Sequence, residues 1–153
     1  MQWLELKLPP LLVWLVFAAA MFGVASSAPR LSFALPGSSG VALALVVLGV
    51  AVAFSGVFAF RGKRTTVNPL TPGAASSVVS DGVYRVSRNP MYLGLLLALA
   101  GWAVYLSNAG AALLLPGFVA YMTRYQIKPE ERALLAKFGS DFAQYMARVR
   151  RWL

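Results

Sequence analysis

Residues 88–123 read RNPMYLGLLLALAGWAVYLSNAGAALLLPGFVAYMT, and this stretch decides the fold. Beyond its first three residues it holds no charged side chain, and Ser-Asn-Ala-Gly at 107–110 interrupts its apolar character. A tight turn at that interruption predicts a hairpin of two apolar helices, at 91–106 and 110–125. Helices of about sixteen residues extend only ~24 Å, which is shorter than a bilayer core. We therefore expect either that the bilayer is locally thinner or that polar residues such as Tyr125 extend the helix ends. Pro116 is expected to kink the second helix.

The composition indicates an integral membrane protein. The chain of 153 residues is 59% hydrophobic and 12% charged, whereas soluble domains carry about 25% charged residues. Two further apolar stretches, 9–28 and 41–60, have the length of about 20 residues that crosses a bilayer. Ser-Ser-Ala at 26–28 resembles a signal-peptide cleavage site, but Pro29 follows it, so the first stretch is expected to stay as a membrane helix.

The distribution of positive charge predicts the orientation in the membrane. The 61–90 connection carries five Lys or Arg residues, the 106–110 turn carries none, and seven follow it in the chain. By the positive-inside rule, the 61–90 connection and both termini are cytoplasmic. The net charge of +9 therefore points to a lipid bilayer as partner, and no aromatic-basic motif of a nucleic-acid-binding module is present.

The C-terminal segment 129–151 predicts an amphipathic helix at the cytoplasmic interface. Apolar residues recur along it at three- and four-residue steps, namely Leu134, Phe138, Phe142, Tyr145 and Val149. Gly139 is a candidate bend, and the segment serves either as a surface anchor or as a cover for a cofactor. The predicted fold is thus a single all-α membrane domain, 1–153, with four transmembrane helices, the last two a tight hairpin, and a C-terminal amphipathic helix.

The residue inventory excludes several chemistries. The chain has no cysteine and no histidine, which removes disulfides, thiol nucleophiles and imidazole acid–base catalysis. Of its five acidic residues only Glu130 and Glu131 are neighbours, and adjacent helical residues are not expected to face one site together. No metal centre is predicted.

Two short motifs carry polar detail at the membrane boundary. Asn89 is a suitable N-cap and Pro90 a suitable first residue for a helix, whose free N–H groups favour an anion. Arg88, with Arg85, is expected to add charge-assisted contacts to a carboxylate or phosphate. In the second motif, Glu130 and Glu131 occupy a first helical turn. The alternative for both motifs is purely structural: a helix cap with topology charges, and carboxylates that compensate a helix dipole.

In this order and spacing, three segments resemble the isoprenylcysteine carboxyl methyltransferase family, which is similar to the phospholipid N-methyltransferases: TTVNPLTP at 65–72, DGVYRVSRNPMYLG at 81–94 and PEERALLAKFGSDFAQYMARVRRW at 129–152. The resemblance covers about residues 64–151. It implies an integral membrane enzyme that uses S-adenosylmethionine, releases S-adenosylhomocysteine, and binds the cofactor between the last membrane helices and the C-terminal segment.

The resemblance also implies roles for individual residues. The family's Arg-His-Pro-x-Tyr motif corresponds to residues 88–92, with asparagine in place of the histidine, and the Glu-Glu motif of the phospholipid enzymes corresponds to 130–131. A Gly-x-Gly motif of those enzymes has no match. The implied catalytic residues are Arg88, Tyr92 and Glu131, and the implied cofactor-binding residues are Tyr84, Arg88, Asn89, Pro90, Met91, Tyr92, Gly94, Glu130 and Glu131.

The expected reaction is transfer of a methyl group to a lipophilic acceptor that enters sideways from the bilayer. A carboxylate or thiolate fits somewhat better than an amine, because an ammonium must first lose a proton to a base. For an amine, the candidate bases are Glu130, Glu131, Tyr84, Tyr92 and Tyr125. Two other functions stay open: an NADPH-dependent membrane reductase of the sterol-reductase type, and a non-catalytic membrane scaffold. The sequence leaves the oligomeric state undetermined.

Overall fold

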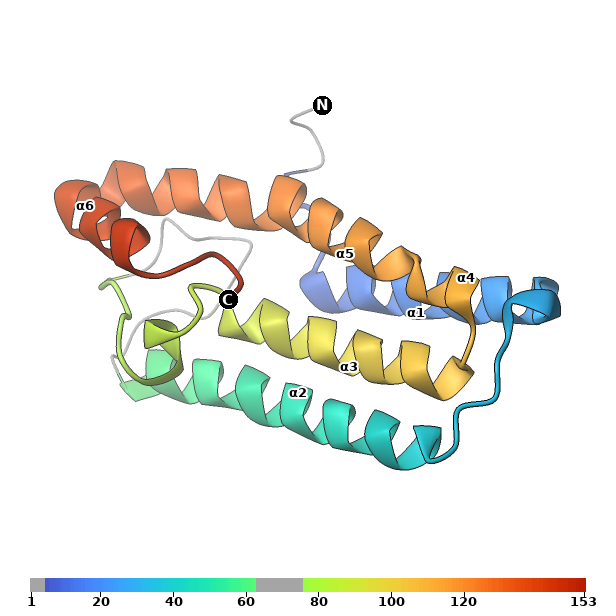
Figure 1. Ribbon diagram of the computed structural model, residues 1–153. Coiled ribbons are helices and arrows are strands. Elements are labelled where there is room, and N and C mark those ends of the chain that lie inside the picture. Colours follow the sequence, from blue (N-terminus) through green and yellow to red (C-terminus); the bar gives the residue numbers. More distant parts are fainter. Residues whose placement is uncertain (1–4, 63–75) are drawn as a thin grey trace.

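The computed structural model describes residues 5–62 and 76–153. The TTVNPLTP segment and the lysine and arginine at 63–64 lie outside the described residues. The described chain is helical and forms no strand, which confirms the predicted all-α class (Figure 1). Its α-helices are α1 (Pro10–Ser27), α2 (Ser38–Gly62), α3 (Pro90–Leu106), α4 (Ala109–Ala112), α5 (Leu114–Met122) and α6 (Lys128–Arg148).

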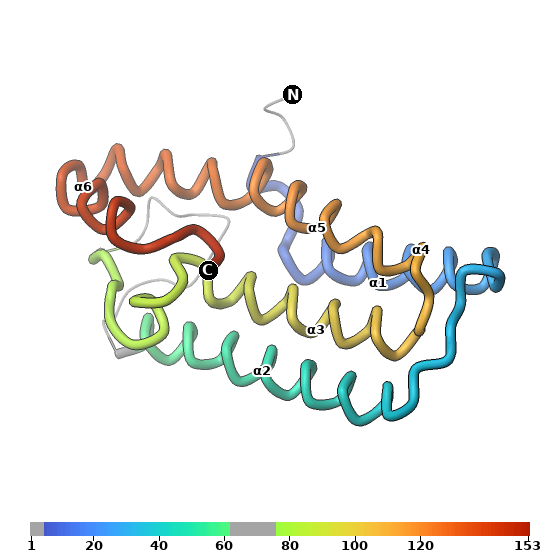
Figure 2. The backbone as a smooth tube through the Cα atoms, in the orientation of Figure 1, coloured from blue at the N-terminus to red at the C-terminus, as the bar shows by residue number. Residues whose placement is uncertain are grey.

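The helices lie roughly along one direction, with α3 in the middle (Figure 1). Helix α2 runs antiparallel to α3 on one side, and α1 packs against α3 on another. The traced backbone shows α4, α5 and the first part of α6 as one long column, while the C-terminus returns to the start of α3 (Figure 2). Helix α3 therefore carries the contacts that hold the bundle together.

Small residues let the backbones of α2 and α3 approach closely. A Cβ atom added at Gly49 would lie 2.5 Å from the carbonyl oxygen of Gly94, and one at Gly101 would lie 2.8 Å from that of Ala42. Apolar helices in a membrane gain little from hydrophobic burial, so close van der Waals packing through small residues drives their association. The glycines thus fix the position of α3 against α2.

Two indole groups join α1 to α3. Trp14 Nε1 donates to the carbonyl oxygen of Leu95 at 3.0 Å, and Trp102 Nε1 donates to that of Ala18 at 3.0 Å. An indole N–H in apolar surroundings needs an acceptor, because leaving it unpaired costs free energy. Each tryptophan therefore satisfies its donor on the neighbouring helix and aligns the two helices.

The turn after α3 closes the hairpin. Ser107 has a left-handed backbone with φ of 46°, and Asn108 caps α4 by accepting from the backbone N–H of Ala111 at 3.0 Å. Asn108 Nδ2 also donates to the carbonyl oxygen of Ala28 at 3.0 Å, which ties this end of the hairpin to α1. The break expected at Pro116 occurs at Leu113, between α4 and α5, because a proline ring clashes with the carbonyl of the residue four positions earlier.

Helix α5 passes into α6 through a π-helical turn, η4 (Thr123–Ile127), without leaving the helical column. The predicted helix 129–151 ends earlier, at Arg148, and Val149 is extended with φ of −119° and ψ of 135°. Gly139 has φ of 52° and ψ of −123° and is the bend within α6. Its left-handed backbone suits glycine, which has no Cβ atom to clash.

The apolar stripe of α6 packs inside the protein. Buried Phe142 and Tyr145 form a cluster with buried Val79 and Tyr84, and the other members of the predicted stripe pack around this cluster. The interfacial position of α6 relative to a membrane stays a prediction. What the structure shows is that the stripe covers the segment leading into α3.

Within residues 5–62 and 76–153, two helices are long and apolar enough to cross a membrane, namely Pro10–Ser27 with mean hydropathy 1.9 and Ser38–Arg61 with 2.7. Helix α3 is apolar but shorter, at 17 residues. Large apolar side chains on the outer faces of α1 and α2 are exposed, for example Leu11 at 59% and Val47 at 59%. Exposed apolar surface of this extent suits contact with lipid, and the crossing of all four predicted segments stays a prediction.

The α2–α3 contact gives a first test. Gly94→Ala places a Cβ atom against the backbone of Gly49 and is expected to cost about 1–3 kcal/mol of stability through overpacking. Gly23→Ala in α1 is the matched control, because a Cβ atom there meets nothing within 4 Å. Thermal unfolding in detergent should therefore show a lower Tm for the first variant and not for the second. Equal Tm values would contradict the assigned packing.

Candidate functional site

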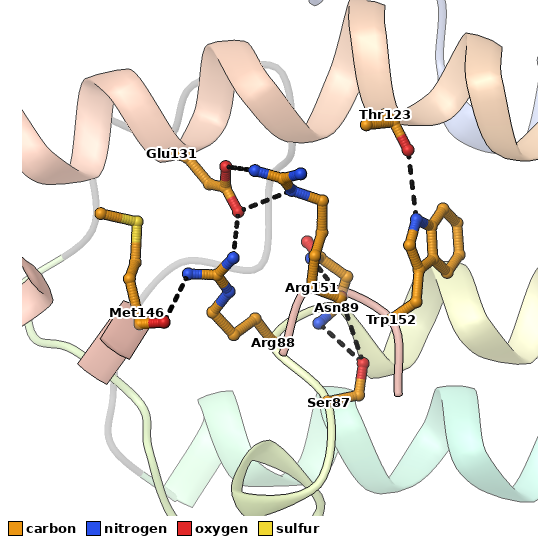
Figure 3. A network of polar contacts seen from close by, with 8 residues as sticks. All are labelled: Ser87, Arg88, Asn89, Thr123, Glu131, Met146, Arg151 and Trp152. Atoms are coloured by element: carbon orange, nitrogen blue, oxygen red, sulfur yellow. Dashed lines mark hydrogen bonds and ion pairs between the residues drawn. The ribbon is translucent and has the colours of Figure 1, made fainter. Parts of the chain in front are cut away.

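Polar side chains from three segments meet where α3 begins (Figure 3). One segment is the 3-10 helix η3 (Gly82–Arg85) with the residues that follow it, the second is the first turn of α6, and the third is the chain after α6. We call residues 149–153 the C-terminal strap. The segments are far apart in the sequence, and their meeting is a result of the fold.

Glu131 is the centre of an ionic cluster. Its Oε1 lies 3.1 Å from Arg88 Nη2, and Arg151 reaches both carboxylate oxygens, with Nε donating to Oε1 at 3.0 Å and Nη2 to Oε2 at 2.7 Å. The side chains of Arg88 and Glu131 are only 11% and 14% exposed. Two guanidinium groups share one carboxylate, so the cluster keeps a net positive charge that can hold an anion.

Main-chain contacts hold the C-terminal strap against the start of α3. The backbone N–H of Arg88 donates to the carbonyl oxygen of Arg150 at 3.0 Å, and Asn89 Nδ2 donates to that of Arg151 at 2.9 Å. At the end of the strap, Trp152 Nε1 donates to Thr123 Oγ1 at 3.1 Å. The strap therefore spans from α3 to the π-helical turn and closes one side of the site (Figure 3).

The entry into α3 differs from the expected cap. Asn89 stands at the N-cap position, but its side chain makes no cap hydrogen bond, because its amide is committed to the strap. The hydroxyl of fully buried Ser87 instead accepts from the backbone N–H of Asn89 at 3.1 Å. Pro90 has no N–H to satisfy. The free N–H groups of the first turn therefore begin at Met91.

Tyr92 and Glu130 form a second, separate pair in the site. The Tyr92 hydroxyl donates to Glu130 Oε1 in a short hydrogen bond. Burial raises the pKa of Glu130 to about 8; the hydrogen bond from Tyr92 opposes this rise, and the negative charge of Glu131 adds to it. Glu130 is therefore largely protonated at neutral pH, whereas Glu131 is ion-paired.

Tyr84 and Tyr145 connect the site to the cluster under α6. The Tyr145 hydroxyl donates to the backbone carbonyl of Tyr84 at 2.8 Å, and the Tyr84 ring packs on Phe60 at a centroid distance of 5.4 Å. Burial raises the pKa of Tyr145 to about 12, against the effect of Arg88, and burial also raises the pKa of Tyr84. Both phenols therefore stay neutral near pH 7.

Residues before α1 contact the π-helical turn η4 and the start of α6. Glu5 pairs with Arg124 at 2.5 Å and also with Arg132, and the hydrogen bond from Arg124 lowers the pKa of this carboxylate. Buried Gln126 donates from Nε2 to the carbonyl oxygen of Leu8 at 2.7 Å. These contacts and the hydrogen bond from Trp152 to Thr123 together hold the π-helical turn.

The structure brings together five of the sequence-predicted residues: Arg88, Asn89, Tyr92, Glu130 and Glu131. Contrary to expectation, both adjacent glutamates reach groups at the start of α3: Glu131 pairs with Arg88, which precedes the helix, and Glu130 accepts from Tyr92 in its first turn. Other predicted residues face α2 instead. A Cβ atom at Gly56 of α2 would lie 3.1 Å from Met91 and 3.2 Å from Pro90, and Gly94 abuts Gly49.

Sequence reasoning missed part of the site. Ser87, Thr123, Arg151 and Trp152 all contribute contacts there. Arg151 and Trp152 lie in the segment 129–152 that resembles the family. This resemblance is the sequence feature that could have indicated them as part of the site. The predicted helix 129–151 includes Arg151, which in a regular interfacial helix would extend toward lipid headgroups instead of turning back to Glu131, and Trp152 lies just beyond it.

Comparisons with known proteins identify related sequences. The family model described as phospholipid methyltransferase matches residues 38–141. An uncharacterized protein of Haemophilus influenzae is 43% identical over 63 residues, which is 41% of this chain and all of that protein. Protein-S-isoprenylcysteine O-methyltransferase B of Arabidopsis thaliana is 26% identical over 111 residues. That match covers 72% of this chain and 56% of the plant protein, so the chain spans about half its length.

No solved structure matches the chain significantly. The family match extends over most of the chain, and the apolar helices suit a membrane methyltransferase. The chain belongs to the phospholipid methyltransferase family.

The strap contact provides a second test. Arg151→Ala removes both hydrogen bonds to Glu131 and should cost about 1–2 kcal/mol, between the values for exposed and buried ion pairs. Arg150→Ala is the control, because its exposed side chain is removed while its carbonyl still accepts from Arg88. Thermal unfolding in detergent distinguishes them. A loss as large for Arg150→Ala would show that general charge, and not the Glu131 contact, matters.

The pKa of Glu130 predicts a pH dependence of stability. Between its ordinary value of 4.5 and about 8, folded Glu130 keeps a proton that the unfolded chain has released. The free energy of unfolding therefore falls as pH rises through this window and levels off above it. Glu130→Gln should remove this contribution, so its stability relative to wild type should improve as pH rises. Parallel stability curves for the two proteins would contradict the burial of Glu130.

Proposed function

We propose that this chain is an S-adenosylmethionine-dependent methyltransferase that acts on a lipophilic acceptor at the cytoplasmic face of a membrane. The observation that carries the proposal is the meeting of Arg88, Tyr92, Glu130 and Glu131 at the boundary of an apolar helix bundle. Membership of the phospholipid methyltransferase family supports the reaction class. The acceptor is a carboxylate, a thiol or an amine.

The residues of the site fit the proposed cofactor. Arg88 Nε is buried and has no hydrogen-bond partner among the described residues, so an acceptor such as a carboxylate would satisfy it. Arg88 and the first free N–H groups of α3 are assigned to the methionine carboxylate. Glu131 or Glu130 is assigned to the amino group or the ribose hydroxyls, as acceptors of hydrogen bonds.

When bound, S-adenosylmethionine supplies a methyl group on a positively charged sulfur. The protein has to hold the acceptor and that methyl group in line, at roughly 3–3.5 Å, which supplies much of the rate enhancement. The buried surroundings of Tyr84 and Tyr92 exclude water and strengthen electrostatic interactions. The C-terminal strap excludes water from the opposite side through its contacts with Asn89 and Thr123.

The proposed topology places this site where a lipophilic acceptor can reach it. Four crossings, with both termini and residues 61–90 in the cytoplasm, put the start of α3 and the first turn of α6 at the cytoplasmic interface. The acceptor then enters sideways from the bilayer and keeps its hydrocarbon part in lipid. Its reactive group meets the polar residues at the end of the bundle.

Ligand-induced stabilisation tests the cofactor assignment. S-adenosylhomocysteine should raise the Tm of the detergent-purified protein with concentration, by the equivalent of about 2.7 kcal/mol at a hundred times Kd. Arg88→Ala and Glu131→Gln should each lose most of this shift. Arg85→Ala is the matched control, since Arg85 is exposed and outside the cluster.

NADPH is titrated in parallel under the same conditions. Stabilisation by NADPH alone would support a reductase, and stabilisation by neither ligand would leave the polar residues as a helix cap with topology charges. An Arg88→Ala variant that binds S-adenosylhomocysteine normally would remove Arg88 from the cofactor site.

A further inference from the structure

Residues before α1 fold back on the helical column of α5 and α6, and we call residues 5–8 the N-terminal clamp. Glu5 Oε1 accepts a hydrogen bond from Arg124 Nη1 at 2.5 Å, and Glu5 Oε2 accepts one from Arg132 Nη2. Arg124 lies in the π-helical turn, and Arg132 directly follows the two site glutamates in α6. One carboxylate therefore bridges two points of the column, one before and one after these glutamates.

A missing backbone donor explains why the clamp binds at this point. Pro129 has no N–H, so the carbonyl oxygen of Tyr125, four residues earlier, lacks its usual α-helical donor. The backbone N–H of Leu6 donates to this oxygen at 3.0 Å. Nearby, fully buried Gln126 donates from Nε2 to the carbonyl oxygen of Leu8 at 2.7 Å. The clamp thus supplies a donor that the proline takes from the helix.

The backbone of Leu6 shows that these contacts are specific. Leu6 has φ of 56°, in the left-handed region. A residue with a Cβ atom is strained there, so the conformation persists only where surrounding contacts hold it. Those contacts are the hydrogen bond to Tyr125 and the ion pairs of the neighbouring Glu5. The column therefore fixes the conformation of the clamp.

The π-helical turn brings the two arginines to the same side of the column. They are eight residues apart in the sequence, and eight α-helical steps of about 100° would leave their directions roughly 80° apart. A π-helical turn holds one residue more than an α-helical turn, so the same eight residues complete close to two full turns. Glu5 then reaches Arg124 and Arg132 together. Its two ion pairs therefore favour the column that contains the π-helical turn.

We infer that Glu5 is a positioning residue of the candidate cofactor site. By bridging the two arginines, it stabilises the rotation of α6 at which the site glutamates reach Arg88 and Tyr92. This inference rests on the proposed function, in which Arg88 and the glutamates bind S-adenosylmethionine. Glu5 acts through the helix and is assigned no contact with the cofactor or the acceptor.

The test measures the binding of S-adenosylhomocysteine to Glu5→Gln by isothermal titration calorimetry in detergent, well below the unfolding temperature. Glutamine keeps the size of the side chain and removes its charge. The Kd should rise about three- to tenfold, a range that the loss of one or two partly exposed ion pairs can produce. An anchor without a positioning role would change the Tm and leave the Kd at the wild-type value.

A double-mutant cycle tests whether the effect acts through the ion pair. Arg124→Gln alone should also raise the Kd. The double variant, Glu5→Gln with Arg124→Gln, should raise it by less than the product of the two single effects, because the second substitution no longer breaks an intact pair. The ratio of the Kd of Glu5→Gln to that of wild type should also shrink in about 1 M salt, since exposed ion pairs are then screened.

Asp141→Asn is the matched control, because it removes an exposed carboxylate elsewhere on α6 and should leave the Kd unchanged. An equal rise of the Kd in this variant would show that net charge, and not the clamp, matters, and would overturn the inference. A wild-type Kd in Glu5→Gln, or single effects that multiply in the double variant, would overturn it as well. The proposed function fails in a different way, when S-adenosylhomocysteine does not bind wild type, and the inference then falls with it.

Discussion

The carboxylate of Glu131 joins three segments that are distant in the sequence: the entry to α3, the first turn of α6 and the C-terminal strap. The side chains of the two arginines that it binds are largely buried, with 11% exposure for Arg88 and 33% for Arg151. A charge withdrawn from water without a partner costs free energy, so Glu131 stabilises Arg88 and Arg151 at these positions. The position of the strap, and with it the closed side of the site, depends on this ion pairing together with the hydrogen bonds that join the strap to Arg88, Asn89 and Thr123.

Two glutamates at adjacent positions acquire opposite properties from their surroundings. Glu131 receives charged donors from two arginines, and Glu130 is buried next to a phenol. The same side chain is an ion-pair partner in one place, whereas burial raises its pKa in the other. Neither property is visible in the dipeptide itself. Both arise because α6 is held over the start of α3, where Arg88 before the helix and Tyr92 in its first turn supply different partners.

The sequence predicts the local features of this fold and not the long-range contacts. Apolar length and the Ser-Asn-Ala-Gly interruption predict helices, because helix formation and chain reversal depend on neighbouring residues. Asn89 shows the limit of such reasoning: its preference for an N-cap is outweighed by a hydrogen bond to the strap. Arg151 shows it again, since regular spacing predicts a continuing helix, whereas the ion pair with Glu131 favours an extended chain after Arg148.

The π-helical turn between α5 and α6 has a geometric consequence for the site. Each residue of an α-helix advances the direction of its side chain by about 100°, and a π-helical turn holds one residue more than an α-helical turn. The side chains after Ile127 are therefore rotated relative to the pattern that α5 would have continued. Packing against α1 and α3 selects which face of α5 is buried, while this phase shift selects where Glu130 and Glu131 point. Because of this one additional residue, the buried face of α5 does not determine the direction in which the glutamates of α6 point, although the helical column is continuous.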